Sequence, residues 1–102
     1  MSGTYGSVGG VCLHEASWRG YPAIVILLLA AGANVDKQSD SGNTPLILAA
    51  NYDRIEVVKE LLKAGANKKL KNNDGNTAYN LTFNKEIKKL LGGGGVFSRM
   101  FG

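Results

Sequence analysis

The stretch NTPLILAANYDRIEVVKELLKAGANKKLKNNDG, residues Asn43 to Gly75, decides the fold, because the chain overlays on itself when it is shifted by the 33 residues of this stretch. The overlay matches apolar and glycine positions: Leu13 with Leu46, Ala16 with Ala49, Leu28-Leu29 with Leu61-Leu62, and Gly32-Ala33-Asn34 with Gly65-Ala66-Asn67. A fixed period of this kind indicates stacked repeats, in which no unit buries its apolar face alone.

Each copy has the pattern of two helices followed by a turn. Thr44-Pro45 supplies an N-cap residue and a proline at the first helical position. The second helix of this copy carries an apolar stripe at helical spacing, formed by Ile55, Val58, Leu61 and Leu62. In the first copy, Gly32 suits a left-handed helix end and Gly42 suits the turn of a hairpin.

The segments TPLILAA (residues 44–50), LLKAGAN (61–67) and DG (74–75) resemble the ankyrin repeat, and the resemblance extends from Gly10 to Leu91. It implies a mainly α fold, a solenoid of stacked helix–turn–helix units with connecting β-hairpin loops, and a protein-binding function. We therefore expect a flexible Gly/Ser leader (1–9), a repeat domain (10–91, with repeats 10–42, 43–75 and a truncated 76–91), a glycine linker (92–95) and an apolar peptide tail (96–102).

Composition narrows the class of protein. A chain of 102 residues supports one small domain. A single cysteine suits a reducing compartment, and the N-terminus lacks the pattern of a signal peptide, so we expect an intracellular protein of the cytoplasm or nucleus. The longest apolar run, Ala23 to Ala31, falls short of the roughly 20 residues that a membrane span needs.

The sequence does not favour an enzyme, since it has one His, one Cys and no paired catalytic motif. We expect no cofactor and no metal. The resemblance implies a structural role for His14, which would tie a helix to a hairpin by hydrogen bonds. Cys12 matches Pro45 of the next copy and is interpreted as packed filler.

Partner contacts in the ankyrin family vary at the hairpin tips and on the inner helices. Carried over by position, this implies that a protein or short helical peptide binds a concave face lined by Trp18, Arg19, Gln38, Asp40, Asn43, Asn51, Tyr52, Lys71 and Asn73. Trp18, Arg19 and Tyr52 are the expected anchors, because aromatic residues and arginine dominate interface energetics. The alternative for Trp18 is that it covers the open end of the stack.

The outer helix of the first copy, Pro22 to Ala31, is apolar on all sides. Ile26 and Leu27 stand where the second copy has Lys59 and Glu60, so they form an apolar patch on the expected wet face. Such a patch suggests a covering subunit, partner or segment of the same chain. A scattered surface pair is the alternative.

The tail VFSRMFG follows four glycines, and Val96, Phe97, Met100 and Phe101 share one face at helical spacing. We expect it to dock as a tethered peptide in a groove, more easily on a second copy than on its own chain, which suggests a homodimer through the tail or through the first outer helix. An engineered fusion that stabilises a weak complex is one alternative. A tail with no role is another.

Positive charge gathers in the second half of the chain, where residues 51–102 hold ten Lys/Arg against five Asp/Glu. Its centre is a group of six lysines: Lys68, Lys69, Lys71, Lys85, Lys88 and Lys89. Nucleic acid or acidic lipid could bind such a surface. Because no aromatic residues are interleaved with the lysines, we favour a solvated face or an acidic protein partner over nucleic acid.

Overall fold

The computed structural model describes residues 13–92 as a stack of short helices. Residues 13–19 form the first helical segment. It is followed by α2 (Pro22–Ala30), α3 (Pro45–Asn51), α4 (Ile55–Lys63), α5 (Ala78–Leu81) and α6 (Lys85–Leu90). No strand occurs within residues 13–92, where the loops fold back through turns. The expected mainly α solenoid is confirmed.

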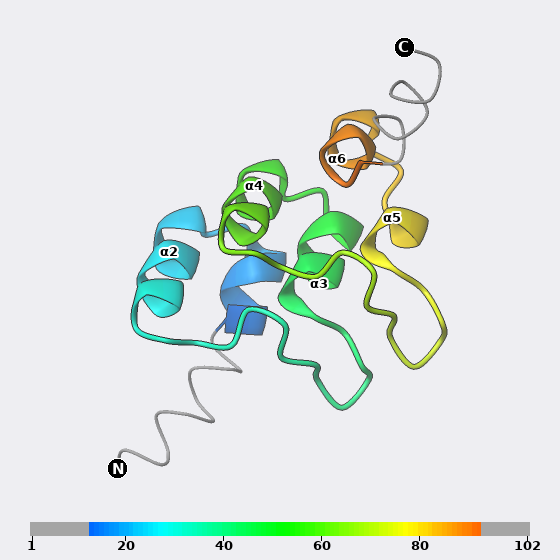
Figure 1. The fold of residues 1–102 in the computed structure, drawn as a ribbon. Helices are drawn as coiled ribbons and strands as arrows, with labels where there is room; N and C mark the ends of the chain where they lie inside the picture. Colours follow the sequence, from blue (N-terminus) through cyan, green and yellow to red (C-terminus); the bar gives the residue numbers. More distant parts are fainter. Residues whose placement is uncertain (1–12, 93–102) are drawn as a thin grey trace.

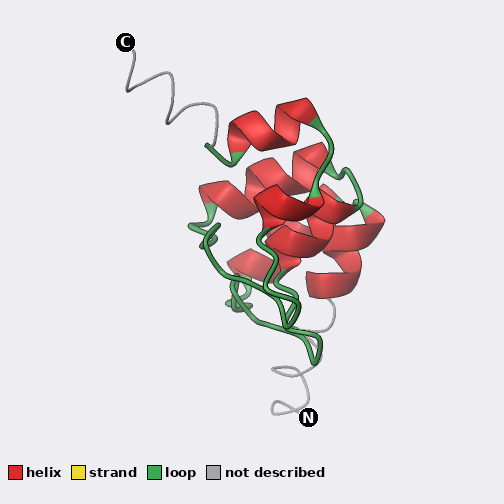
Figure 2. Cartoon of the chain, turned by 90° about the vertical axis from the view of Figure 1, so that its right-hand side faces the viewer, coloured by secondary structure: helices red, strands yellow, loops and turns green. Residues whose placement is uncertain are grey.

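The helices form two rows (Figure 1). The inner row holds residues 13–19, α3 and α5, and the outer row holds α2, α4 and α6. Within the rows α3 packs on α5, and α4 packs on both α2 and α6. The long loops project on one side of the inner row, and Figure 2 shows them gathered at one edge of the helices. The inner row and these loops together form one surface, which we call the inner face.

Side-chain caps explain where the inner helices begin. Thr44 accepts a hydrogen bond from the backbone N–H of Ile47, at 3.1 Å from Oγ1, and so caps α3. Thr77 and Asn80 form a reciprocal capping box at the start of α5. The Thr44 cap stands where the sequence predicted a helix start.

The outer helices α2 and α4 end in the same way. Gly32 and Gly65 adopt left-handed backbone conformations with φ of 96° and 88°. The next residue of each, Ala33 or Ala66, donates its N–H back into the helix at 3.0 Å. These are the glycine helix ends that the repeated GAN triplet predicted.

The apolar core runs through both rows. Val58 and Leu61, two residues of the predicted stripe, are buried, while Leu62 is half-buried and packs against the core. The core is completed by Leu13, Ala16, Val25, Leu46, Ile47, Ala49, Ala50, Val57, Ala78, Ile87 and Leu91. Both rows contribute to it in each repeat, so the repeats share one interior.

His14 ties the first helical segment to the following loop, as the resemblance implied. Its Nε2 lies 2.7 Å from the carbonyl oxygen of Lys37 and 3.1 Å from that of Asn43. Carbonyl oxygens only accept hydrogen bonds, so Nε2 carries the proton. The structural role of this histidine is confirmed.

Candidate functional site

An aromatic cluster lies where the first two inner helices end. Trp18 belongs to the first helical segment, and Tyr52 is the residue that closes α3. Their ring centroids are 5.4 Å apart and the ring planes are tilted by 44°. Trp18 is half-buried and Tyr52 is 47% exposed, so the pair presents aromatic surface to solvent. The structure therefore brings two of the three predicted anchors into contact.

Arg19, the third predicted anchor, joins the same cluster. Its guanidinium carbon lies 4.8 Å from the centroid of the Trp18 ring, in a cation–π arrangement. Its Nε donates to Glu15 Oε2 at 2.7 Å. The hydrogen bond to Glu15, and then the negative charge of that carboxylate, raise the pKa of the Arg19 guanidinium. Because both side chains are about half exposed, the ion pair orients the guanidinium more than it stabilises the fold.

Arg54 supports the aromatic cluster through the backbone of Trp18. This arginine was not predicted from the sequence as a site residue. Its Nε donates to the backbone carbonyl of Trp18 at 2.8 Å. A Cβ added to Gly20, whose φ is 81°, would lie 2.8 Å from Arg54 Cδ, so the arginine side chain lies directly against this turn. The sequence signal that could have indicated this contact was Gly20. A glycine in a tight turn leaves room for the side chain of a neighbouring residue, here Arg54.

Three of the polar residues predicted as partner contacts are engaged within the chain. The Nε2 of Gln38 donates at 2.9 Å to the carbonyl oxygens of Gly42 and Lys71. The Nδ2 of Asn73 donates to the Asp40 carbonyl at 2.9 Å. Asn43 Oδ1 accepts from Asn72 Nδ2 at 3.0 Å. These amides join one loop to the next, so they shape the inner face as well as line it.

The other predicted polar contacts are more available. Asp40, Asn51 and Lys71 are all exposed. No hydrogen bond or ion pair of their side chains is seen within residues 13–92. Together with the aromatic cluster they form the more exposed part of the inner face.

Phe83 is a surface aromatic residue that sequence reasoning missed. It lies between α5 and α6 and is 93% exposed. The third repeat is shorter than the others, so this short turn leaves the ring without the packing that a full repeat provides. The shortened repeat was visible in the sequence, but its effect on one side chain was not.

The predicted apolar patch lies on α2. Ile26 is 45% exposed and Leu27 is 67% exposed, and Ile24 on the same helix is also 45% exposed. No acidic residue occurs in the first turn of α2 and no basic residue in its last turn. The predicted tail residues Val96, Phe97, Met100 and Phe101 lie outside the described residues.

The six lysines lie at the end of the stack formed by the last loop and α6. Lys88 Nζ is 4.3 Å from the centroid of the Tyr79 ring. Lys68 Nζ would be 2.8 Å from a Cβ added to Gly92, so the loop lysine lies against the end of α6. The ion pairs seen within residues 13–92 join Arg19 to Glu15, Lys59 to Glu56 and Lys63 to Glu60. None of them neutralises this basic end.

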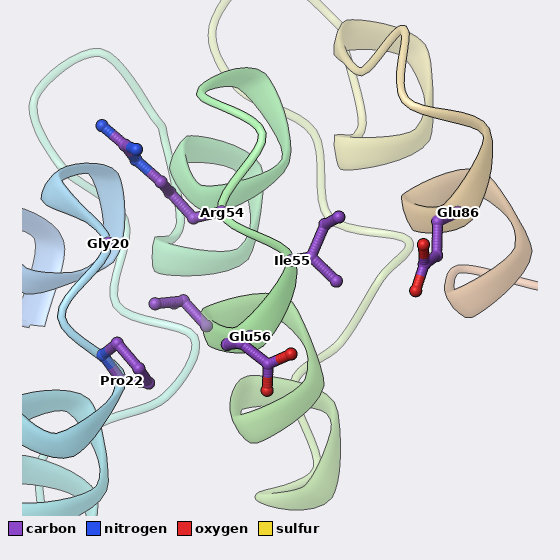
Figure 3. Close-up of a pocket in the computed structure, with 7 residues that line it drawn as sticks. Gly20, Pro22, Arg54, Ile55, Glu56 and Glu86 are labelled. Carbon is purple, nitrogen blue, oxygen red and sulfur yellow. The ribbon is translucent and has the colours of Figure 1, made fainter.

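A shallow cavity of about 470 Å³ lies between the starts of the outer helices (Figure 3). Arg54, Ile55 and Glu56 line it from α4 and the residue before it, and Glu86 lines it from α6. Its lining contains no Ser, Cys or His, so it offers no nucleophile or histidine base. No cluster of three metal-ligating side chains occurs within residues 13–92, and no helix there could cross a membrane.

A comparison with known proteins agrees with the repeat pattern of the sequence. A family model described as ankyrin repeats (3 copies) matches residues 13–92. The chain is 44% identical over 52 residues to ankyrin repeat and SOCS box protein 3 of Bos taurus, and 41% identical over 56 residues to the Homo sapiens protein of that name. These alignments cover 51% and 55% of this chain but only 10% and 11% of the relatives.

Ankyrin repeat and SOCS box protein 11 of Pongo abelii is 40% identical over 49 residues, which cover 48% of this chain and 15% of that protein. The chain therefore spans a small fraction of the length of the relatives it matches.

Proposed function

Because the chain belongs to the ankyrin-repeat family, we propose that it is a protein-binding module whose inner face holds a segment of a protein partner. Ankyrin repeats are generally protein–protein interaction modules, and the family is generally non-enzymatic. The partner class we propose is a protein or a short helical peptide, bound without chemical change. Recognition is then the whole of the mechanism.

The aromatic cluster carries this proposal. Tyr52 and Trp18 together present an exposed aromatic surface, and Arg19 lies over it. Tyr, Trp and Arg are the residues that most often dominate binding energy when they are covered by a partner. A surface that is half-buried before binding loses less rotamer freedom when the partner arrives.

The geometry also supports a preorganised site. Glu15 fixes the Arg19 guanidinium, and Arg54 fixes the backbone of Trp18. Both supports come from within the stack, so the anchors are held before a partner binds. We assign Asp40, Asn51 and Lys71 to direct polar contacts with the partner. We assign Gln38, Asn43 and Asn73 to contacts that also depend on the shape of the loops.

The test is a selection of binders followed by matched variants. Short peptides are selected from a displayed library against the wild-type chain, and their affinities are measured by titration against Trp18→Ala, Tyr52→Ala and Lys63→Ala. Lys63 lies on the outer row with its side chain 73% exposed, so it serves as the control. Folding of each variant is checked by circular dichroism.

We expect most selected peptides to lose at least about thirtyfold in affinity with Trp18→Ala or Tyr52→Ala, since anchors of this kind contribute roughly 2 kcal/mol or more. Lys63→Ala should change little. Unchanged affinities in both aromatic variants would place the binding site elsewhere.

The basic end supports a second candidate, the binding of an acidic surface. Six lysines without an acidic partner among residues 13–92 attract an acidic protein, an acidic lipid or nucleic acid through the same charge. We favour the acidic protein, because the sequence carries no recognised nucleic-acid-binding motif. Affinity that falls steeply with salt and is lost in Lys68→Gln/Lys71→Gln would identify this surface. Affinity independent of salt would exclude it.

Two further parts of the proposal rest on sequence alone. An intracellular setting, cytoplasm or nucleus, rests on the single cysteine. The engineered-fusion hypothesis rests on the tetraglycine linker and the apolar residues that follow it. It predicts that the free peptide VFSRMFG binds the repeats in trans.

A further inference from the structure

The same positions of the two outer helices α2 and α4 differ sharply in burial. Ile24 of α2 is 45% exposed, whereas Val57, which stands 33 residues later in α4, is 1% exposed. Leu28 of α2 is half-buried, whereas its counterpart Leu61 is 0% exposed. Positions i and i+4 lie on one side of a helix. One flank of α2 is therefore open where the corresponding flank of α4 is closed.

The direction of this open flank follows from the packing. α4 contacts α2 on one side and α6 on the other, whereas the only outer helix against α2 within residues 13–92 is α4. Ile24 is exposed and is therefore not covered by α4, whereas Leu28 is half-buried and packs against the core at the edge of the same surface. Leu27, which is 67% exposed, lies beside them. We call the surface formed by Ile24, Leu27 and Leu28 the open flank.

We propose that the open flank binds the apolar residues Val96, Phe97, Met100 and Phe101 of a second copy of this chain. The open flank lacks the helix that α2 supplies to α4, so it fits an apolar segment with helical spacing. The four tail residues have this spacing within a heptapeptide. The α2 sequence PAIVILLLA contains no charged residue, so the contact buries no charged side chain of this helix. The four apolar tail residues carry no charge either.

Chain length excludes the tail of the same copy. From Gly92 to Val96 the chain spans at most about 14 Å, at roughly 3.5 Å per residue. The axes of α2 and α6 are separated by two helix spacings of 8–10 Å, or about 16–20 Å. The open flank lies on the far side of α2 and adds to this separation. The linker is therefore too short in the same copy, whereas a second copy can approach the tail directly.

A direct contact between the α2 helices of two copies explains the surface less well. α2 has nine residues and a length of about 14 Å. A stable interface buries about 800 Å² on each partner, which is more than a single short helix supplies. Two tails exchanged between two copies provide two contacts, and the second forms within a complex that is already joined. This reciprocal exchange is closed and two-fold symmetric.

The experiment measures the mass of the full chain in solution by sedimentation equilibrium. The flank variant is Leu27→Glu, the tail variant is Phe97→Ser/Phe101→Ser, and the control is Ile26→Glu. Ile26 is exposed to the same extent as Ile24, and the second repeat has Lys59 at its position, so a charge is compatible with the fold there. Circular dichroism verifies the folding of all three.

We expect the wild type and Ile26→Glu to be dimers, and the flank and tail variants each to be monomers. Mixing the flank variant with the tail variant should restore a complex, because one has an intact tail and the other an intact flank. A dimer that survives the tail variant would instead mean an α2–α2 contact and overturn the proposal. A wild type that stays monomeric at millimolar concentration would overturn it as well.

One further variant separates this inference from the proposed inner-face site. If Trp18→Ala abolished the dimer while Leu27→Glu preserved it, the tail would be a ligand of the inner face, and the open flank would have no part in it. If Leu27→Glu abolished the dimer while selected peptides still bound through Trp18, both surfaces would function independently.

Discussion

The contact between Trp18 and Tyr52 predicts a measurable coupling between the first two repeats. The rings are 5.4 Å apart and tilted by 44°, an arrangement worth about 0.5–1.5 kcal/mol beyond the area that it buries. Tyr52 is 47% exposed, so water weakens the contact, and we expect the lower part of this range, about 0.5–1 kcal/mol.

A double-mutant cycle measures this coupling. The free energy of unfolding in urea is determined for the wild type, Trp18→Ala, Tyr52→Ala and the double variant. Far-UV circular dichroism is the appropriate signal, because Trp18 is the only tryptophan and its fluorescence is lost in two of the four proteins. With a urea m-value of about 1 kcal/mol/M, the coupling corresponds to roughly 0.5–1 M of non-additivity in the midpoints.

Tyr52→Phe is the control, because it keeps the ring and removes the hydroxyl. We expect it to preserve the coupling with Trp18. A coupling within about 0.3 kcal/mol of zero, the scatter of independent sites, would refute the reasoning. It would show that the two rings act separately and that Trp18 does not need Tyr52 to hold its position.

Three further predictions concern the backbone and the caps. Asp53 has φ of 60° where the first repeat has Gly20, so Asp53→Gly should raise stability by about 0.5 kcal/mol; a lower melting temperature would contradict this. Gly42→Ala should cost about 1–3 kcal/mol in urea unfolding, because its Cβ would lie 2.5 Å from Asn73 Oδ1, whereas Gly75→Ala, with nothing within 4 Å, should cost less; equal losses would argue against the clash. Thr44→Ala should lower the free energy of unfolding by about 1–2 kcal/mol and Thr44→Ser by much less, since only the hydroxyl caps α3. Equal stability of the two variants would show that the cap does not stabilise the fold.

The fold was predictable from the sequence because each local signal occurs in both full copies of the repeat. Thr44-Pro45 and the glycine of the GAN triplet gave the helix boundaries of the second copy, and the match at a spacing of 33 residues extended them to the first. His14 was also assigned correctly, because the resemblance links that position to the following loop. These features depend on local chemistry and on the period.

The geometry of the candidate site was predictable only in part. Trp18, Arg19 and Tyr52 come together because their positions repeat, but the Arg54 hydrogen bond to Trp18 crosses 36 residues and has no sequence pattern. Whether an amide side chain is free for a partner or bonds to a neighbouring loop depends on the distance between the loops. The sequence does not contain this distance, so it could not show that Gln38 and Asn73 bond to the neighbouring loop. Exposure of Phe83 depends on what a shortened turn leaves uncovered, which is a property of packing.

Hydrogen bonds join the two long loops of residues 13–92 directly to each other. Gln38 reaches the carbonyl of Lys71, and Asn73 reaches that of Asp40, each across 33 residues. The spacing of the repeats is thus set at the loop edge by polar bonds of fixed length, and at the opposite edge by the width of packed outer helices. We expect the curvature of the array to follow from the difference between these two spacings, and to be present before a partner binds. We expect that lengthening one of these amide side chains would separate the two loops. The curvature of the inner face, where we propose that a partner binds, would change with it.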